Sequence, residues 1–459
     1  MKRLISATLA AAVLCGPAAA TPDDPDQLQA AYTRYLRAIE TAQMTVDGSM
    51  GMRQGHEEED RYEAGLFLNG IIDASVTMAL IDTPDYPLMA LVPVPADRLG
   101  LNNPDNLYYA ARFSDGRDYK LTGLRGLART FVVQVNNGLP GLTDTKGKTL
   151  SYMTDKQLSV GKDGSFSIAL SREQPTKGDW LALQPGSDNL LVRFSYQDWA
   201  QEQTKPSTIA ISTADGEPAG KLQITRRLAA EMLEDAATSI EEQADLYSRS
   251  FDAMVKRGTN KLYGPHAPTN QQATASHQWS FIGTFSIEPD EAMVITVKDA
   301  SNAKYYNLEA ANAWLNTFEF VHHQSSLNRS QLRVDPDGYI RFVVSPVDPG
   351  VPNWIDTTGA TQGWIWSRWQ DVDGQIGPEY TPKTKIVKRA DLRSVLPEDT
   401  PVVTPEQRRE ALAEREALLR QRFSGADPSR PELLRRLRAV EELLGHPIAQ
   451  QRLQDPIIR

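Results

Sequence analysis

The chain has a single cysteine among its 459 residues, Cys15, and it lies near the N-terminus. Disulfide frameworks, thiol nucleophiles and cysteine-based zinc sites are therefore excluded for most of the molecule. Basic residues are outnumbered as well, with 49 Lys and Arg against 59 Asp and Glu and a net charge of −10. A general nucleic-acid binder needs a basic surface to neutralise phosphates, so we expect no nucleic-acid partner.

Motifs of high catalytic specificity are also missing. The chain contains no Gly-x-Ser-x-Gly nucleophile elbow and no His-Glu-x-x-His zinc-binding helix. After the N-terminal residues, no segment has the pattern of a membrane-crossing helix, which needs about 20 predominantly apolar residues. We therefore predict no transmembrane segment, and no motif names a reaction.

The first 20 residues have the order of a secretory signal peptide. A basic pair at 2–3 precedes the apolar run 4–14, and alanines at 18–20 precede Thr21. The run is too short to span a bilayer, and small residues before the cleavage site are typical of such signals. We predict cleavage after Ala20 and a periplasmic or secreted protein, whose mature chain has lost the only cysteine.

The rest of the sequence alternates between helical and strand-like patterns. Residues 26–45 carry apolar side chains at helical spacing, whereas from about residue 86 short runs of Val, Leu, Tyr and Phe are interrupted by Gly, Pro, Asn and Asp. We predict a mainly β fold with helical additions, built from two tandem jelly-roll or β-sandwich domains. The predicted segments are a signal peptide (1–20), an N-terminal helical segment (21–85), a first β-sandwich domain (86–220), a helical connector (221–275), a second β-sandwich domain (276–390) and a helical C-terminal tail (391–459).

An internal repeat relates the two β-rich blocks. A displacement of 174 residues aligns Asp163-Gly164 with Asp337-Gly338, Leu121-Thr122 with Ile295-Thr296, Phe131-Val132 with Tyr305-Tyr306, and Trp180 with Trp354. When the displacement is one residue longer, Arg193 aligns with Arg368. The constant displacement indicates two related domains, each with an Asp-Gly hairpin turn. Shared residues such as Trp180 and Trp354 are then expected to serve the fold.

The two copies differ directly after the shared tryptophan. Asp356, Thr357 and Thr358 stand where the first copy has Ala, Leu and Gln at 182–184. Since the first sandwich lacks these polar groups, the fold does not require them. They are therefore better candidates for a functional role than the residues that both copies share.

The residues Pro349–Gly359, followed by Arg368-Trp369, resemble the closing signature of the bacterial domain-of-unknown-function family 1214. Further similarity, which extends the resemblance to about residues 86–200 and 276–370, lies in Tyr305–Leu308, Ser326–Asn328, Gly178–Leu181, Leu191–Arg193 and Asp198-Trp199. The resemblance implies jelly-roll-like β domains and brings no established reaction. The family often has a histidine after the Asp-Thr-x-Gly segment, where this chain has Ala360.

The predicted strand 364–369 is the main candidate for ligand binding. With period-two alternation, Trp364, Trp366 and Arg368 share one face. Two indoles beside a guanidinium offer a flat platform for a sugar ring, with hydrogen bonds at its rim from Asn353, Asp356 or Thr357. The alternative is that these tryptophans seal the interface between the two β domains or with the tail.

A catalytic alternative uses some of the same residues. Asp356 would act as general acid or base and Arg368 would stabilise charge, as in a hydrolase or lyase. A divalent metal is a weaker alternative, with candidate ligands His322, His323 and His277. Adjacent histidines on a strand point to opposite faces, so both could bind one metal only in a turn, whereas one of them could join His277 and an acid in a cupin-like site. A surface or hydrogen-bonded histidine is commoner than a metal ligand, so we predict no cofactor. The acidic run after His56 is interpreted as the solvated start of a helix.

The tail contains two helix-start signatures, Thr404 with Gln407 and Ser429 with Glu432. An apolar stripe then follows on a helix rich in Arg and Glu, and it includes Leu433, Leu434, Leu437, Val440 and Leu444. Either this tail packs on its own protein, or it is an arm that makes the protein a homo-oligomer.

Our leading hypothesis from the sequence is an exported tandem β-sandwich protein that binds a small-molecule or glycan ligand, a carbohydrate or glycolipid of the cell envelope. The alternatives are a hydrolase or lyase that acts on envelope material, and a structural protein whose helical tail serves assembly.

Overall fold

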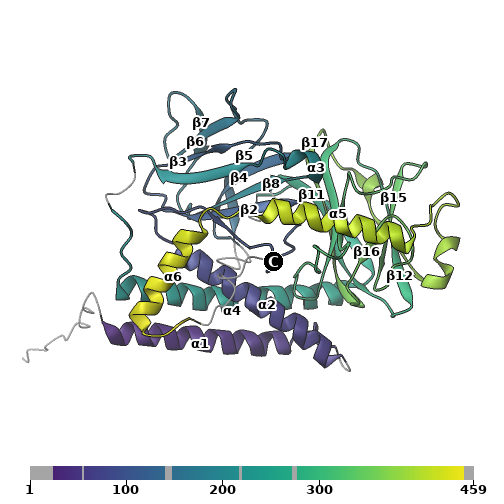
Figure 1. Ribbon diagram of the computed structural model, residues 1–459, viewed down its shortest axis with the longest axis horizontal. Coiled ribbons are helices and arrows are strands. Elements are labelled where there is room, and N and C mark those ends of the chain that lie inside the picture. Colours follow the sequence, from purple (N-terminus) through teal and green to yellow (C-terminus); the bar gives the residue numbers. More distant parts are fainter. Residues whose placement is uncertain (1–23, 54–55, 140–146, 217–219, 271–276, 449–459) are drawn as a thin grey trace, which may run out of the picture.

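The computed structural model describes residues 24–53, 56–139, 147–216, 220–270 and 277–448. Two β domains lie beside each other over a layer of helices formed by α1 (Pro25–Asp47), α2 (Glu57–Leu80) and α4 (Arg226–Arg257) (Figure 1). Two further helices, α5 (Pro405–Phe423) and α6 (Arg430–Leu444), run over the outside of this assembly. The predicted signal peptide and Cys15 lie outside the described residues.

The first β domain is a sandwich of two sheets around one apolar core. The five-stranded sheet has the order β1-β2-β8-β4-β5 and the four-stranded sheet has the order β7-β6-β3-β9. The elements are β1 (Ala90–Leu91), β2 (Asn106–Arg112), β3 (Tyr119–Leu124), β4 (Thr130–Asn137), β5 (Lys148–Thr154), β6 (Ser165–Ser171), β7 (Asp179–Ala182), β8 (Asn189–Ser195), the short helix α3 (Trp199–Glu202) and β9 (Thr208–Thr213).

The second β domain repeats this arrangement. Its sheets have the orders β10-β11-β17-β13-β14 and β16-β15-β12-β18, so every strand stands where the strand nine places earlier stands in the first domain. The elements are β10 (Lys261–His266), β11 (Gln278–Ser286), β12 (Glu291–Lys298), β13 (Ala303–Ala311), β14 (Ser326–Asn328), β15 (Tyr339–Ser345), β16 (Trp354–Asp356), β17 (Gln362–Val372), the 3-10 turns η1 (Pro378–Tyr380) and η2 (Arg389–Ser394), and β18 (Lys383–Lys388).

The shared tryptophans hold the same place in both copies, as the repeat predicts. Trp180 Nε1 donates to the carbonyl of Ser171 at 3.1 Å, and Trp354 Nε1 donates to the carbonyl of Ser345 at 3.0 Å. Each indole thereby closes a parallel strand pair, β6 with β7 and β15 with β16. The prediction that these residues serve the fold is confirmed.

The alignment of Phe131 with Tyr305 in the repeat is wrong by one residue. In β4, Phe131 lies opposite Phe194, whereas in β13 the equivalent contact is made by Tyr306 opposite Trp369. Both aromatic pairs are packed inside their own sandwich. Tyr305 therefore faces the other way, because a shift of one residue moves a side chain to the opposite face of a sheet.

The helical connector is shorter than predicted. The helix α4 ends at Arg257, and β10 follows at Lys261–His266 within the segment assigned to the connector. The strand was missed because it contains Gly264-Pro265, a pair that ordinarily interrupts a strand. Proline is tolerated here because β10 is an edge strand, which leaves one row of amides without ladder partners.

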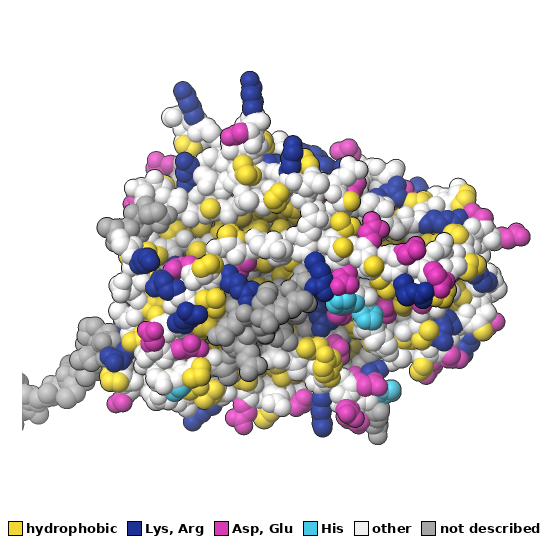
Figure 2. Space-filling model, viewed as in Figure 1, with side chains coloured by type: hydrophobic (Ala, Val, Ile, Leu, Met, Phe, Trp, Pro, Cys, Tyr) yellow, Lys and Arg dark blue, Asp and Glu magenta, His cyan; other side chains and the backbone are white. Residues whose placement is uncertain are grey.

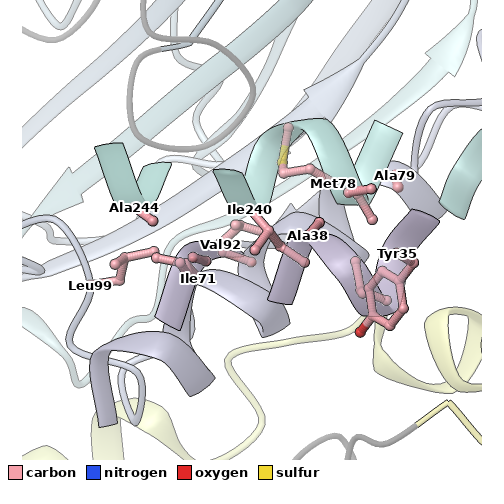
Figure 3. Close-up of a cluster of buried hydrophobic side chains, with 14 of the residues drawn as sticks. Tyr35, Ala38, Ile71, Met78, Ala79, Val92, Leu99, Ile240 and Ala244 are labelled. Atoms are coloured by element: carbon pink, nitrogen blue, oxygen red, sulfur yellow. The ribbon is translucent and has the colours of Figure 1, made fainter. Parts of the chain in front are cut away.

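The helical layer has its own apolar core, to which α1 and α4 contribute small, aliphatic and aromatic side chains such as Tyr35, Ala38, Ile240 and Ala244 (Figure 3). Small residues let the two helices approach closely, and the Arg34–Glu241 ion pair joins them at the surface. The predicted helix at 26–45 corresponds to α1 and is confirmed.

Helix α2 corrects the expectation that no later segment has the composition of a membrane span. By length and composition Glu57–Leu80 qualifies, but 67% of the apolar stretch is buried inside the protein. Its side chains, among them Phe67, Ile71 and Met78, belong to the core shared with α1 and α4. The described structure thus accounts for its hydrophobicity by packing.

The two C-terminal helices pack on their own protein. The capping box of Thr404 with Gln407 is present at the start of α5, as predicted. Ser429 is the N-cap of α6 without a side-chain cap bond, because its hydroxyl bonds Asp427 instead. Three members of the apolar stripe, Leu433, Leu437 and Val440, are buried in the helical-layer core.

Candidate functional site

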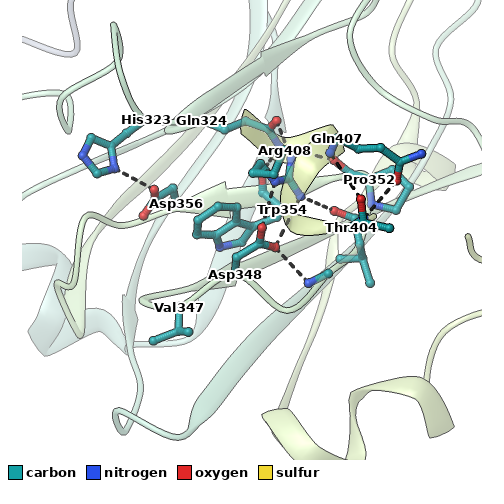
Figure 4. Close-up of polar contacts among 12 residues, drawn as sticks. His323, Gln324, Val347, Asp348, Pro352, Trp354, Asp356, Thr404, Gln407 and Arg408 are labelled. Carbon is teal, nitrogen blue, oxygen red and sulfur yellow. Dashed lines mark hydrogen bonds and ion pairs between the residues drawn. The ribbon is translucent and has the colours of Figure 1, made fainter. Parts of the chain in front are cut away.

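The signature segment forms a tight loop after β16. Asp356 is buried at the end of this strand, and its Oδ1 accepts the Thr358 amide at 2.8 Å. Its Oδ2 lies 2.7 Å from His323 Nδ1 (Figure 4). The hydrogen bond and charge of Asp356 raise the pKa of His323, whose side chain is 43% exposed. The structure therefore forms an Asp–His pair at this loop.

The side chains of two other predicted ligand-binding residues form hydrogen bonds with backbone groups of the protein. Asn353 accepts the Arg333 amide and donates to the Arg333 carbonyl, each at 2.8 Å. The Thr357 hydroxyl donates to the carbonyl of Ala360 at 2.5 Å. Both side chains are buried, so they fix the loop rather than present hydrogen-bonding groups to a ligand.

A hollow lies beside this loop, between Thr358–Ala360 and the first turns of α2, and we call it the acidic groove. Its volume is about 880 Å³. The lining is rich in carboxylates and amides, and includes Arg53, His56, Glu57, Glu58, Glu59, Asp60, Tyr62, Glu63, Asn312, Trp314 and Gln362. Thr358 has a φ of +54°, an unusual conformation for a β-branched residue that is associated with functional loops.

Within the acidic groove, some charges are already paired. Arg53 forms an ion pair with Asp60 at 2.8 Å, and its Nη1 donates to the Thr361 hydroxyl at 2.5 Å. Glu63 accepts the Asn312 amide at 2.7 Å. These bonds join α2 to the second β domain and fix the walls of the groove. The sequence showed only the acidic run, because the facing residues are some 250 positions away.

The tryptophan platform is not an exposed surface. Trp364 is 2% exposed, packs against Phe251 of α4, and donates from Nε1 to the Ala313 carbonyl at 3.2 Å. Trp366 is partly buried, lines a small cavity and has Arg368 stacked 5.0 Å from its ring centre. The face of β17 that points out of its own sandwich is covered by the helical layer and the first domain. Trp364 is therefore buried, as the sealing alternative expects, but these contacts are with α4 and with its own domain.

Arg368 and Asp356 belong to different networks, so the predicted catalytic pairing is not formed. Arg368 is buried in an ion pair with Glu309, and its Nη2 donates to the Leu101 carbonyl at 3.2 Å. Burial raises the pKa of Glu309 to about 7, and the Arg368 charge limits that rise. The alternation of β17 turns Arg368 toward the first domain, whereas Asp356 lies at the far sheet.

The outer faces of the two five-stranded sheets meet at a buried polar interface. Asp105 accepts hydrogen bonds from Tyr305, Trp199 and Asn328, each at 2.7 Å. The sequence did not predict this interface, since its residues look like ordinary outward-facing strand positions.

A small, partly open cavity of about 100 Å³ lies beside this interface. Arg193 and Arg368 both line it, together with Tyr108, Gln278, Trp366 and several aliphatic side chains. Figure 2 shows, in contrast, an outer surface on which acidic and basic side chains are mixed. The cavity thus differs from the surface in gathering two buried positive charges.

The three histidines proposed as metal ligands lie in three environments. His322 is exposed beside Glu319 and Glu416, and His323 pairs with Asp356. Burial, followed by the charges of two nearby arginines, lowers the pKa of His277 well below its ordinary value. Among the described residues, no group of three or more His, Cys, Asp or Glu side chains is arranged to hold a metal ion.

The fold defines a tandem β-sandwich protein with helical additions, as predicted. Residues 110–197 match the family model described as "Protein of unknown function (DUF1214)", which confirms the family resemblance in the first β domain. No curated protein matches the chain.

Solved structures add a relation of fold. The crystal structure of an uncharacterized protein from Burkholderia cenocepacia has a TM-score of 0.72 and 24% identity, over 80% of this chain and 99% of its own. The VPA0106 protein from Vibrio parahaemolyticus aligns with a TM-score of 0.41 and 11% identity, over 71% of this chain and 98% of its own. The first of these structures has the same fold as this chain.

Proposed function

We propose that the protein is exported and binds a carbohydrate, or the sugar headgroup of a glycolipid, of the cell envelope, and that the acidic groove holds this ligand. The observation that carries the proposal is a groove of about 880 Å³ whose walls present carboxylates and amides. Such groups suit a polyhydroxylated ligand, because each of their oxygens accepts hydrogen bonds from hydroxyls.

Exposure indicates which side chains are available to the ligand. Tyr62 is 69% exposed and offers an aromatic face on which a sugar ring can stack. The carboxylate of Glu59 is 75% exposed beside it. Asp60 and Glu63 are held by Arg53 and Asn312, so we assign them to the walls. Tyr62 and Glu59 are therefore the residues expected to contact the ligand.

A binding experiment tests this assignment. Neutral and amino sugars of the bacterial envelope are titrated by calorimetry into the purified protein and into Tyr62→Ala. We expect a sugar to bind and the variant to lose at least tenfold in affinity, because stacking is lost. Tyr339→Ala is the matched control, since this tyrosine is 38% exposed and lies outside the groove. Equal affinity of the two variants would contradict the assignment.

Export is a separate part of the proposal and needs its own measurement. The support is the signal-peptide pattern in residues 1–20. We expect mass spectrometry of the natively expressed protein to give a mature N-terminus at Thr21. A full-length chain in the cytoplasmic fraction would contradict export and would leave the sugar proposal standing.

General acid–base catalysis is the second candidate function, and the His323–Asp356 pair favours it. A buried carboxylate orients the imidazole, an arrangement that suits a general base. This candidate predicts that the purified protein hydrolyses envelope material and that His323→Gln abolishes the hydrolysis. Unchanged hydrolysis in this variant would reject the pair as the catalytic centre.

A further inference from the structure

The equivalent arginines of the two β domains have different partners. Arg193 of β8 donates to Gln134 Oε1 of β4 at 2.6 Å, and Arg368 of β17 forms its ion pair with Glu309 of β13. Each partner lies at the same position of the same strand in its copy. One arginine therefore faces a carboxylate and the other faces a neutral amide.

From this difference we infer that the cavity between the two domains binds a small organic carboxylate, with Arg193 as its principal partner. Arg193 is 6% exposed, and among the described residues it has no ion pair. Its contacts there are the Gln134 amide oxygen and the ring of Tyr108, 5.6 Å away. A buried charge without a counter-ion is costly, so an anion is the missing partner.

Arg193 does not lose this charge by deprotonation at neutral pH. Burial, together with the nearby charge of Arg368, lowers its pKa to about 10. The guanidinium is still cationic at neutral pH. Because Glu309 is the ion-pair partner of Arg368, the described residues of the cavity carry an excess of one positive charge.

The cavity also contains a hydrogen-bond donor that no described group uses. Trp366 Nε1 is buried and has no partner among the described residues, and the same ring lines the cavity with Arg193. An indole N–H donates only, so a ligand here must bring an acceptor. Two guanidinium groups and an indole together favour a carboxylate, whose two oxygens accept several bonds.

The other residues that line the cavity indicate which organic group the carboxylate ligand carries. Val92, Leu99, Leu139 and Leu191 supply an apolar lining. About 100 Å³ admits roughly three water-sized groups at about 30 Å³ each, which suits a short aliphatic acid. Inorganic phosphate fits less well, because its additional oxygens would face aliphatic side chains.

The backbone next to the cavity is strained, as at many ligand sites. Arg98 and Leu101 have φ values of +54° and +56°, and Gly100 between them has +67°. Positive φ is costly for the two residues that are not glycine. The Leu101 carbonyl bonds Arg368 and the Leu101 amide bonds Leu315, so this segment holds the two domains in place around the cavity.

Thermal unfolding with added acids tests the inference. Butyrate is the probe, and acetate, inorganic phosphate and sodium chloride at equal ionic strength are comparators. We expect butyrate to raise the Tm of the full chain by several degrees, with smaller effects of the comparators. An equal rise with chloride, or none with butyrate, would overturn the assignment of an organic carboxylate.

Two variants assign the effect to the cavity. Gln134→Glu places a carboxylate beside Arg193 and copies the second domain, so we expect a higher Tm without ligand and no response to butyrate. Arg249→Gln, a change of an exposed arginine on α4, is the control and should keep the full response. The groove variant Tyr62→Ala should also keep it, which separates this site from the sugar site. A full butyrate response in Gln134→Glu would refute the inference.

Discussion

The two β domains share their sheet order and their closing tryptophans, yet their central sheets differ in charge. In the second domain a buried arginine is matched by Glu309, and in the first the equivalent arginine is matched by Gln134. The sheet order therefore does not require the carboxylate. What differs between equivalent positions, at the face where the domains meet, points to a function that neither sandwich needs for folding.

The largest expected effect comes from breaking the ion pair of the second domain. Glu309→Gln leaves Arg368 buried without a charge partner, and we expect a loss of about 3–5 kcal/mol in the free energy of unfolding. Urea denaturation measures it. Gln134→Glu is the reciprocal variant and should gain about 1–2 kcal/mol. A cost below 1 kcal/mol for Glu309→Gln would remove the contrast between the two copies.

A second contrast concerns the residues that directly precede β2 and β11. Asp105 precedes β2 and accepts three side-chain hydrogen bonds, whereas both ring nitrogens of His277, before β11, have no partner among the described groups. Asp105→Ala should cost about 2–4 kcal/mol, because it leaves buried donors unpaired. His277→Ala should cost less in the same denaturation experiment, and the reverse order would contradict this description of the interface.

The tryptophans that both domains share should give similar effects in the two copies. Trp180→Phe and Trp354→Phe each remove one indole-to-carbonyl bond, worth about 1 kcal/mol. The second should cost somewhat more, because Arg408 of α5 lies 5.1 Å from the ring of Trp354. Calorimetric Tm values of the two variants test this, and a much larger loss for Trp180→Phe would show that the closing bonds are not equivalent.

The smallest expected effect is the pH dependence that the His323–Asp356 pair gives the second domain. Asp356 raises the pKa of His323, so the pair stabilises the fold below the unfolded histidine pKa of about 6.5 and loses this contribution as pH rises through the folded pKa. The effect is modest because His323 is partly exposed. Asp356→Asn should flatten the Tm profile between pH 5 and 9, and an unchanged profile would exclude the pair as its source.

Much of the architecture follows from local patterns. The alternation of β17, the Asp-Gly turns and the capping box of Thr404 depend on neighbouring residues, and the repeat identified the two sandwiches. The strand β10 was missed because an edge strand tolerates the Gly264-Pro265 pair. The match of Phe131 to Tyr305 was wrong because the displacement between the copies changes by one residue from β3 to β4.

The sites were less predictable, because long-range packing decides them. Period-two alternation placed Trp364, Trp366 and Arg368 on one face correctly, but it could not tell that this face is covered. Arg368 pairs with Glu309, which is 59 positions away in the sequence. In the acidic groove, Glu63 contacts Asn312, which is 249 positions away. Gln134 and Glu309 are both visible in the sequence, but only the sheet register shows that they occupy equivalent positions.

The central claim is that the first domain leaves a buried positive charge for a carboxylate ligand. Calorimetric titration of butyrate into the unmodified protein and into Gln134→Glu tests it most directly. We predict one binding site per chain in the unmodified protein and at least a tenfold weaker affinity in the variant. Equal affinity in both proteins would contradict the claim.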